Sequence, residues 1–166
     1  MFDEYGIELS TTTIYKILAE KYQLRSKWKK NQLRGPIPEA FNPREVIQMD
    51  TVDFGQIFAF TGVDIFTKEI SVKLYESLTA KDGLDFSTFS FNNSFNHVEL
   101  LQTDGGPEFK AELRSNVFKY ADRFRVARPY KKNEQSYIES FNRSLRKECL
   151  GWSKYKQSDI PSLEKE

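Results

Sequence analysis

Residues 98–109, Val-Glu-Leu-Leu-Gln-Thr-Asp-Gly-Gly-Pro-Glu-Phe, constrain the fold of this chain more than any other segment. The apolar start predicts a buried strand, and the two glycines permit backbone angles that a Cβ would resist. Pro107 suits the first turn of a helix, where its missing N–H costs nothing. A strand that ends on Asp104 would hold this carboxylate in the crevice where open α/β sheets bind ligands. Taken alone, the pattern is equally typical of an ordinary turn, so the rest of the chain has to decide.

The hydrophobic pattern of the main domain predicts three strands, then helices alternating with two further strands. We therefore expect an α/β domain in which a three-stranded antiparallel meander is extended by two parallel strands. The result would be a mixed five-stranded sheet flanked by helices. The expected strands are 46–54, 57–66, 69–75, 98–103 and 124–127, and the expected helices are 79–91, 107–120 and 135–150.

Residues 1–22 predict one helix that starts at a cap on Ser10 or Thr11. It could be a recognition helix for DNA, or an amphipathic helix docked on the main domain. Residues 23–44 combine a Lys/Trp cluster with three prolines and predict a basic linker.

Composition restricts the chemistry. The chain has one cysteine and one histidine, which excludes an internal disulfide and a zinc site built from this chain alone. A metal would be held by carboxylates, which suits Mg²⁺ or Mn²⁺. We see no signal peptide and no run of the roughly 20 apolar residues that a membrane span needs, so we expect a cytoplasmic protein with no membrane partner. Basic residues dominate 16–34 and 123–156, whereas acids dominate 39–85, as expected of a metal-dependent enzyme that acts on a polyanion.

Three carboxylates should converge. Asp50 lies in the first strand and Asp104 ends the fourth, and these strands are expected to be neighbours. Glu139 follows in the last helix; 53 residues separate the two aspartates and 34 separate Asp104 from Glu139. Such carboxylates can hold two divalent ions roughly 3.5–4 Å apart, which stabilise the incoming and leaving oxygens of a phosphodiester.

The last helix should present cations beside its acid. Glu139, Arg143 and Arg146 are spaced i, i+4 and i+7 and share one face, with Asn142 and Lys147 beside them. Alone, this spacing would more often mean a Glu–Arg pair that supports the helix. The opposite stripe, Ile138, Phe141, Leu145 and Cys149, is expected in the core.

The remaining acids are weaker candidates. Asp53 should point to the sheet face opposite Asp50, Asp64 should do structural work, and Glu108 should favour a helix dipole. Glu134 lies in the loop before the last helix, and His97 is interpreted as structural.

Three segments together carry a resemblance to a known family. Residues 48–51 (Gln-Met-Asp-Thr), 102–109 and 133–146 closely resemble the signatures of bacterial insertion-sequence DDE transposases, which have a retroviral-integrase-type catalytic core. The resemblance covers about residues 45–152 and implies a ribonuclease-H-like fold. It also implies that Asp50, Asp104 and Glu139 are the catalytic metal ligands for two Mg²⁺ or Mn²⁺ ions.

The resemblance implies partners as well. Arg143 and Arg146 would grip DNA with Lys147 and Asn142, and residues 128–135 would form the mobile active-site loop with Lys131 and Lys132 on DNA. The partner would be double-stranded DNA, both transposon ends and target, met at the nucleoid by a homo-oligomer of a longer parent protein. Residues 1–22 would be the end of a helix-turn-helix, and residues 153–166 a truncated helical region.

Two other functions stay open. The chain could be an inactive remnant that only binds DNA or a transposase partner, or a nuclease of the same fold without strand transfer. An α/β scaffold with incidental acids is a third reading.

Overall fold

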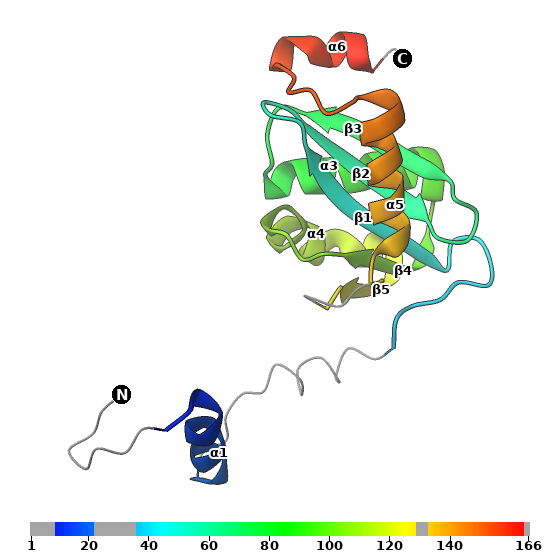
Figure 1. Cartoon of the computed structure of the whole chain (residues 1–166). Coiled ribbons are helices and arrows are strands. Elements are labelled where there is room, and N and C mark those ends of the chain that lie inside the picture. The colour runs from blue at the N-terminus through cyan, green and yellow to red at the C-terminus, as the bar shows by residue number, and fades with distance from the viewer. Residues whose placement is uncertain (1–8, 22–35, 129–132, 165–166) are drawn as a thin grey trace. The chain divides into compact units, whose positions relative to one another are not determined.

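A computed structural model describes residues 9–21, 36–128 and 133–164 of the chain. The chain divides into two compact units, residues 1–35 and 36–166. Figure 1 shows the second unit as a sheet with helices on its faces. No helix in the described ranges is long and apolar enough to cross a membrane.

The first unit contains helix α1, Thr11–Lys21. The hydroxyl of Ser10 accepts a hydrogen bond from the backbone N–H of Thr13 at 3.2 Å, so Ser10 is the cap. Ile17 and Leu18 are exposed. The two proposed roles of this helix therefore stay predictions.

The second unit is built on one five-stranded sheet whose order is β3-β2-β1-β4-β5. β1 pairs antiparallel with β2, and β2 with β3, whereas β1–β4 and β4–β5 are parallel. The predicted mixed sheet and the predicted neighbourhood of the first and fourth strands are both confirmed. The strands are β1 Val46–Asp53, β2 Phe58–Asp64, β3 Ile70–Tyr75, β4 Val98–Thr103 and β5 Ala121–Val126.

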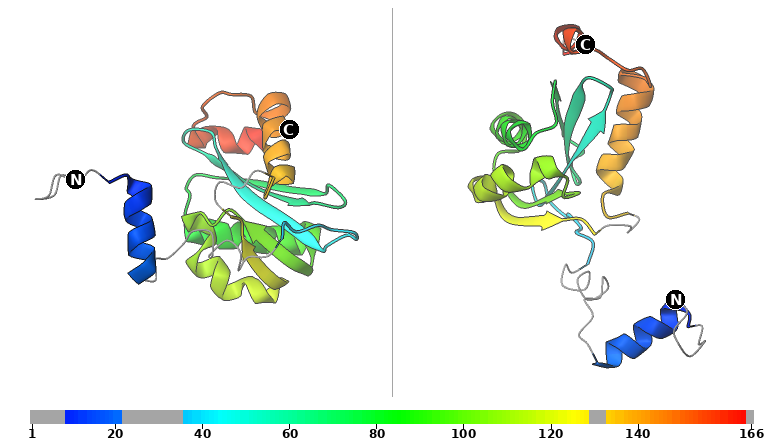
Figure 2. Two further views of the ribbon diagram at one scale, coloured as in Figure 1. Left: turned by 60° about the horizontal axis from the view of Figure 1, so that its bottom comes forward. Right: turned by 90° about the vertical axis from the view of Figure 1, so that its left-hand side faces the viewer.

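Helices cover both faces of this sheet. α3 (Ala80–Ser90) and α4 (Ala111–Asn116) lie on one face, and α5 (Ser136–Ser144) crosses the other (Figure 2). Thr79 starts α3 with a capping box, in which its hydroxyl and the Asp82 carboxylate satisfy each other's backbone N–H groups. The short helix α6 (Ile160–Leu163) lies near the C-terminal end.

Strand alternation sends neighbouring residues of β1 to different helices. Ile47 and Met49 belong to the hydrophobic cluster that α3 and α4 cover. Val46 packs with Ile138 of α5 on the other face. Asp50, an even-numbered residue like Val46, therefore faces α5.

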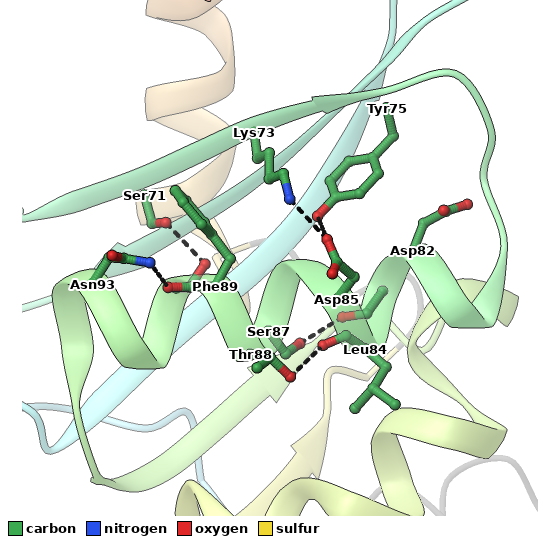
Figure 3. A network of polar contacts seen from close by, with 12 residues as sticks. Ser71, Lys73, Tyr75, Asp82, Leu84, Asp85, Ser87, Thr88, Phe89 and Asn93 are labelled. Carbon is green, nitrogen blue, oxygen red and sulfur yellow. Dashed lines mark hydrogen bonds and ion pairs between the residues drawn. The ribbon is translucent and has the colours of Figure 1, made fainter.

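A polar network joins α3 to the edge strand β3 (Figure 3). Asp85 accepts hydrogen bonds from Lys73 at 2.8 Å and from Tyr75 at 2.7 Å. Burial, then the bond to Asp85, raises the pKa of the Tyr75 hydroxyl above its usual value. The Tyr75 hydroxyl consequently stays protonated, and donates to Asp85, throughout the physiological pH range.

Two expectations about helices are wrong. The helix expected over 107–120 is broken into a 3₁₀ turn at Pro107–Phe109, α4 and a second 3₁₀ turn at Val117–Lys119. It packs tightly on α3, where a Cβ at Gly83 would lie 2.2 Å from the carbonyl oxygen of Glu108. Cys149, expected in the core, is exposed because α5 continues as a π-helical turn, Leu145–Cys149, which shifts the helical phase.

The segment after α5 returns to the sheet. Tyr155 donates its N–H to the carbonyl of Phe54 at 2.8 Å and accepts from the N–H of Gln56 at 3.1 Å. Ile160 and Leu163 then pack against the cluster that contains Leu74 and Leu145. This return covers the hairpin end of β1 and β2.

Asp64 fastens the other end of these strands. Its fully buried carboxylate accepts hydrogen bonds from the backbone N–H groups of Arg44, Phe66 and Thr67 at 2.9, 2.8 and 3.3 Å. The predicted structural role of Asp64 matches these contacts.

We expect Asp64→Ala to lower the free energy of unfolding by about 3 kcal/mol, because it removes a fully buried carboxylate that accepts three backbone hydrogen bonds and leaves a cavity in their place. Urea denaturation would measure the loss. The control, Asp122→Ala, removes an exposed carboxylate that pairs with His97, and we expect it to change stability by less than about 0.5 kcal/mol. Equal losses for the two variants would contradict the assignment.

Candidate active site

The parallel pairing of β1 with β4 brings the two aspartates together. Its register aligns Gln48 with Gln102 and Met49 with Thr103. Asp50 and Asp104 occupy the next position of each chain, on the face that α5 covers. Asp104 is exposed and its Oδ1 accepts the N–H of Gly106 at 2.7 Å. Gly105 must be glycine here, because its φ is +83° and a Cβ would lie 2.4 Å from Val126.

Asp50 is a carboxylate under electrostatic strain. Burial is the main cause that raises its pKa from 3.8 to about 6, and the negative charges of Asp104 and Glu108 raise it further. Hydrogen bonds from the Thr51 backbone and the Asn142 side chain oppose the rise. The register of β1 and β4 sets Asp50 beside Asp104, so a cation between the two carboxylates would relieve their repulsion.

Asn142 of α5 fixes the orientation of Asp50. Its Nδ2 donates to Asp50 Oδ2 at 2.8 Å, and its Oδ1 accepts from the Thr61 hydroxyl at 2.9 Å. Asn142 is 9% exposed. The amide predicted to contact DNA therefore points into the protein.

Glu139 lies across a cleft from β1. A cavity of about 540 Å³ is lined by Asp50 on the strand side and by Glu139, Arg143 and Arg146 on the α5 side. The expected common face of these three helical residues is thus present. A larger cavity, of about 730 Å³, lies beside Leu74 and Leu163 and contains none of the three predicted acids.

A buried ion-pair network holds the start of α5. Glu134 is 2% exposed, and its carboxylate pairs with the guanidinium groups of Arg125, at 3.1 Å, and Arg128. Its backbone carbonyl accepts hydrogen bonds from Gln48 at 3.1 Å and Gln102 at 2.6 Å.

Gln48 extends the same network. Its Oε1 accepts the backbone N–H of Ile138 at 3.2 Å, one residue before Glu139. Sequence reasoning treated Glu134 as a weak loop candidate. The sequence shows two arginines, Arg125 and Arg128, upstream of Glu134, but only the fold shows that Glu134 is buried and that both guanidinium groups pair with its carboxylate.

Glu108 stands in the first turn of the 3₁₀ helix Pro107–Phe109, as expected, but its burial was not predicted. It is 3% exposed, Thr51 donates to its Oε1 at 2.9 Å, and its Oε2 has no hydrogen-bond partner. Because Thr51 and Asp50 are adjacent in β1, Glu108 lies on the face opposite α5. Its charge acts on Asp50 through the sheet.

The carboxylates of the site suit a hard divalent cation, although the three predicted ligands are not gathered around one point. Asp50 and Asp104 offer carboxylate oxygens from the neighbouring inner strands β1 and β4, and Glu139 faces the same cleft as Asp50. Among the described residues, no three acidic, histidine or cysteine side chains are grouped tightly enough to hold a metal ion. The pair of aspartates fits the cation, and Glu139 would have to approach it.

The remaining predicted contacts are less defined. Lys147 is exposed in the π-helical turn. Lys131 and Lys132 lie outside the described residues. Arg146 is held in place, since it donates to the Asp53 carbonyl at 2.9 Å and its guanidinium lies over the Phe54 ring.

By sequence, the chain matches no protein-family model and no curated protein. Its structure is similar to the catalytic core domain of BIV integrase, with a TM-score of 0.56 and 18% identity over 73% of this chain and 79% of that one. The chain has the fold of a retroviral integrase core. The predicted ribonuclease-H-like architecture is therefore confirmed.

Two further solved structures agree. The HTLV-2 integrase catalytic core domain in complex with magnesium matches with a TM-score of 0.54 and 14% identity, over 66% of this chain and 71% of that one. The simian T-cell lymphotropic virus intasome in complex with PP2A regulatory subunit B56 gamma matches with a TM-score of 0.62 and 18% identity over 70% of this chain. This chain covers 44% of the viral intasome chain.

The raised pKa of Asp50 makes stability depend on pH. Between pH 3.8 and about 6 the folded protein binds more protons than the unfolded chain, so stability falls as pH rises through this window. In metal-free buffer, we expect Asp50→Asn to stabilise the fold at pH 7 by on the order of 2 kcal/mol. Urea midpoints at several pH values would measure this. A wild-type stability that rises from pH 4 to 6 in parallel with that of Asp50→Asn would contradict it; Asp53→Asn, at the exposed end of β1, is the control.

The buried network predicts a local effect at α5. Glu134→Gln leaves two arginines without their carboxylate, so we expect a loss of about 3 kcal/mol and faster amide exchange at Ile138. Hydrogen exchange followed by mass spectrometry would detect it. The matched control is Glu99→Gln, which removes an exposed partner of Arg123 and should leave the exchange of α5 unchanged. An unchanged exchange rate in Glu134→Gln would refute the anchoring role.

Proposed function

We propose that this chain carries the catalytic core of a DDE-type polynucleotidyl transferase that cleaves DNA strands and joins them in transposition and integration. One observation carries the proposal. The parallel register of β1 and β4 sets Asp50, within β1, beside Asp104, which directly follows β4, and Glu139 lines the same cleft as Asp50. The motifs that resemble insertion-sequence transposases converge on this place.

The proposed ligands for two Mg²⁺ or Mn²⁺ ions are Asp50, Asp104 and Glu139. Bound ions would supply charge stabilisation for the attacking and leaving oxygens of a phosphodiester. The chain's own residues would do the rest. Asn142 holds the Asp50 carboxylate in one orientation, and the Glu134 network holds the helix that brings Glu139.

Arginine is suited to DNA because its guanidinium matches the geometry of a phosphate. Arg143 and Arg146 would bind the backbone beside the acids, and Lys147, Lys131 and Lys132 would add charge around them. The proposed partner is double-stranded DNA, as transposon end and as target, at the bacterial nucleoid. The magnesium-bound HTLV-2 core and the viral intasome, which share this fold, support the metal and the assembly of a longer parent into an oligomer.

We expect the full chain to nick supercoiled plasmid DNA in Mn²⁺, and Asp104→Asn to lower the rate about 100-fold or more, equivalent to about 2.7 kcal/mol. The control is Asp122→Asn, an exposed aspartate of β5, which should retain the wild-type rate. Activity that survives Asp104→Asn would refute the site.

The products distinguish the rival functions. An oligonucleotide joined to the plasmid indicates strand transfer, because joined strands cannot come from hydrolysis. Nicks without joined products indicate a nuclease of this fold. DNA binding without either product indicates an inactive remnant, and isothermal calorimetry would then show whether Asp50→Asn changes Mn²⁺ binding.

A further inference from the structure

Trp152 is a large aromatic side chain in an unusual place. It is 71% exposed and lies on the rim of the cleft that Asp50 and Glu139 also line. It belongs to none of the hydrophobic clusters formed by the described residues. Packing of this domain therefore does not explain why tryptophan stands at this position.

The ring is brought there by the end of the helix. Gly151 has a φ of +69°, and a Cβ on it would meet nothing within 4 Å. Glycine is thus favoured for its backbone angle alone, which ends the helical path and turns the chain at Trp152.

Arg146 holds the indole beside the acids. The Arg146 guanidinium lies 5.4 Å from the centroid of the Trp152 ring and 4.8 Å from that of Phe54. It also donates to the Asp53 carbonyl at 2.9 Å. An arginine with these three contacts is fixed, so the ring next to it is positioned while most of its surface stays in solvent.

We propose that Trp152 is a stacking platform for an unpaired nucleobase at the end of a DNA strand. The proposal rests on the proposed function and names a further part of its substrate. An exposed aromatic surface beside cations is what single-stranded nucleic acid needs, because bases stack on the ring while phosphates meet the guanidinium groups. Arg143 and Arg146, which line the same cleft, supply these cations.

The charges favour a nucleic acid over a protein occupant. The side of the cleft that ends in Trp152 carries Arg143 and Arg146, which would bind phosphates. The acids of the cleft would bind divalent cations, and a nucleic acid could coordinate the same cations through its phosphates. A base in a duplex is already stacked on its neighbours, so the platform serves a frayed end or a single-stranded overhang. Strand ends with unpaired nucleotides should consequently bind better than blunt ends.

The test uses the full chain in buffer with Ca²⁺ and fluorescence anisotropy of two labelled duplexes. One is blunt and the other carries an overhang of about three nucleotides. Stacking is worth about 1–3 kcal/mol per base, so we expect the overhang to bind roughly 5- to 150-fold more tightly. Trp152→Ala should abolish this preference, and Trp152→Phe should keep most of it.

Phe118→Ala is the matched control, because it removes an aromatic side chain that is 69% exposed in the 3₁₀ turn after α4. It should leave the preference unchanged. In a Trp28→Phe background, Trp152 is the sole tryptophan, and its fluorescence should be quenched by the overhang and not by the blunt duplex.

Three outcomes would overturn the proposal. A preference that persists in Trp152→Ala refutes stacking and leaves the proposed DNA chemistry intact. Equal weakening of both duplexes, with a changed mass in size-exclusion chromatography, assigns the ring to contact between copies of the chain. Failure of the wild type to bind either duplex refutes the platform and also counts against the proposed function, which the nicking assay tests separately.

Discussion

The carbonyl oxygen of Glu134 joins the centre of the sheet to the helix that carries the third acid. It accepts hydrogen bonds from Gln48 and Gln102, the two glutamines that the parallel register of β1 and β4 places side by side. The next even-numbered position of each chain holds an aspartate. The Glu134 peptide group therefore fixes the start of α5 relative to both strands. The position of Glu139 relative to Asp50 depends on these two hydrogen bonds.

The ionised form of Asp50 destabilises the fold. Asp50 is partly buried and close to Asp104 and Glu108, so its ionisation lowers the free energy of unfolding. Hydrogen bonds from Asn142 and the Thr51 backbone reduce this loss of stability without removing it. Perturbed ionisable groups cluster where proteins act on substrates, and a cation bound as proposed between Asp50 and Asp104 would lower the pKa of Asp50.

The sequence was sufficient for the sheet because strand alternation and the Gly-Gly-Pro turn are local signals. It was insufficient where tertiary packing decides. The helix expected over 107–120 is broken at Lys110, whose backbone angles are not helical, next to the close contact of the Glu108 carbonyl with Gly83 of α3. Cys149 is exposed because a π-helical turn changes the helical phase. Glu108 and Glu134 were undervalued for the same reason, since burial of a carboxylate depends on partners far away in the chain. The catalytic roles of Asp50, Asp104 and Glu139 stay predictions, as does any part played by residues 129–132.

Four of the groups around the cleft, Glu139, Asn142, Arg143 and Arg146, stand on one continuous helical segment. Each added or deleted residue within a helix rotates everything beyond it by about 100°. A length change between Gln135 and Glu139 would thus turn acid, amide and cations away from Asp50 together. Descendants of this chain should therefore lose function abruptly when an insertion or deletion falls within this helical segment.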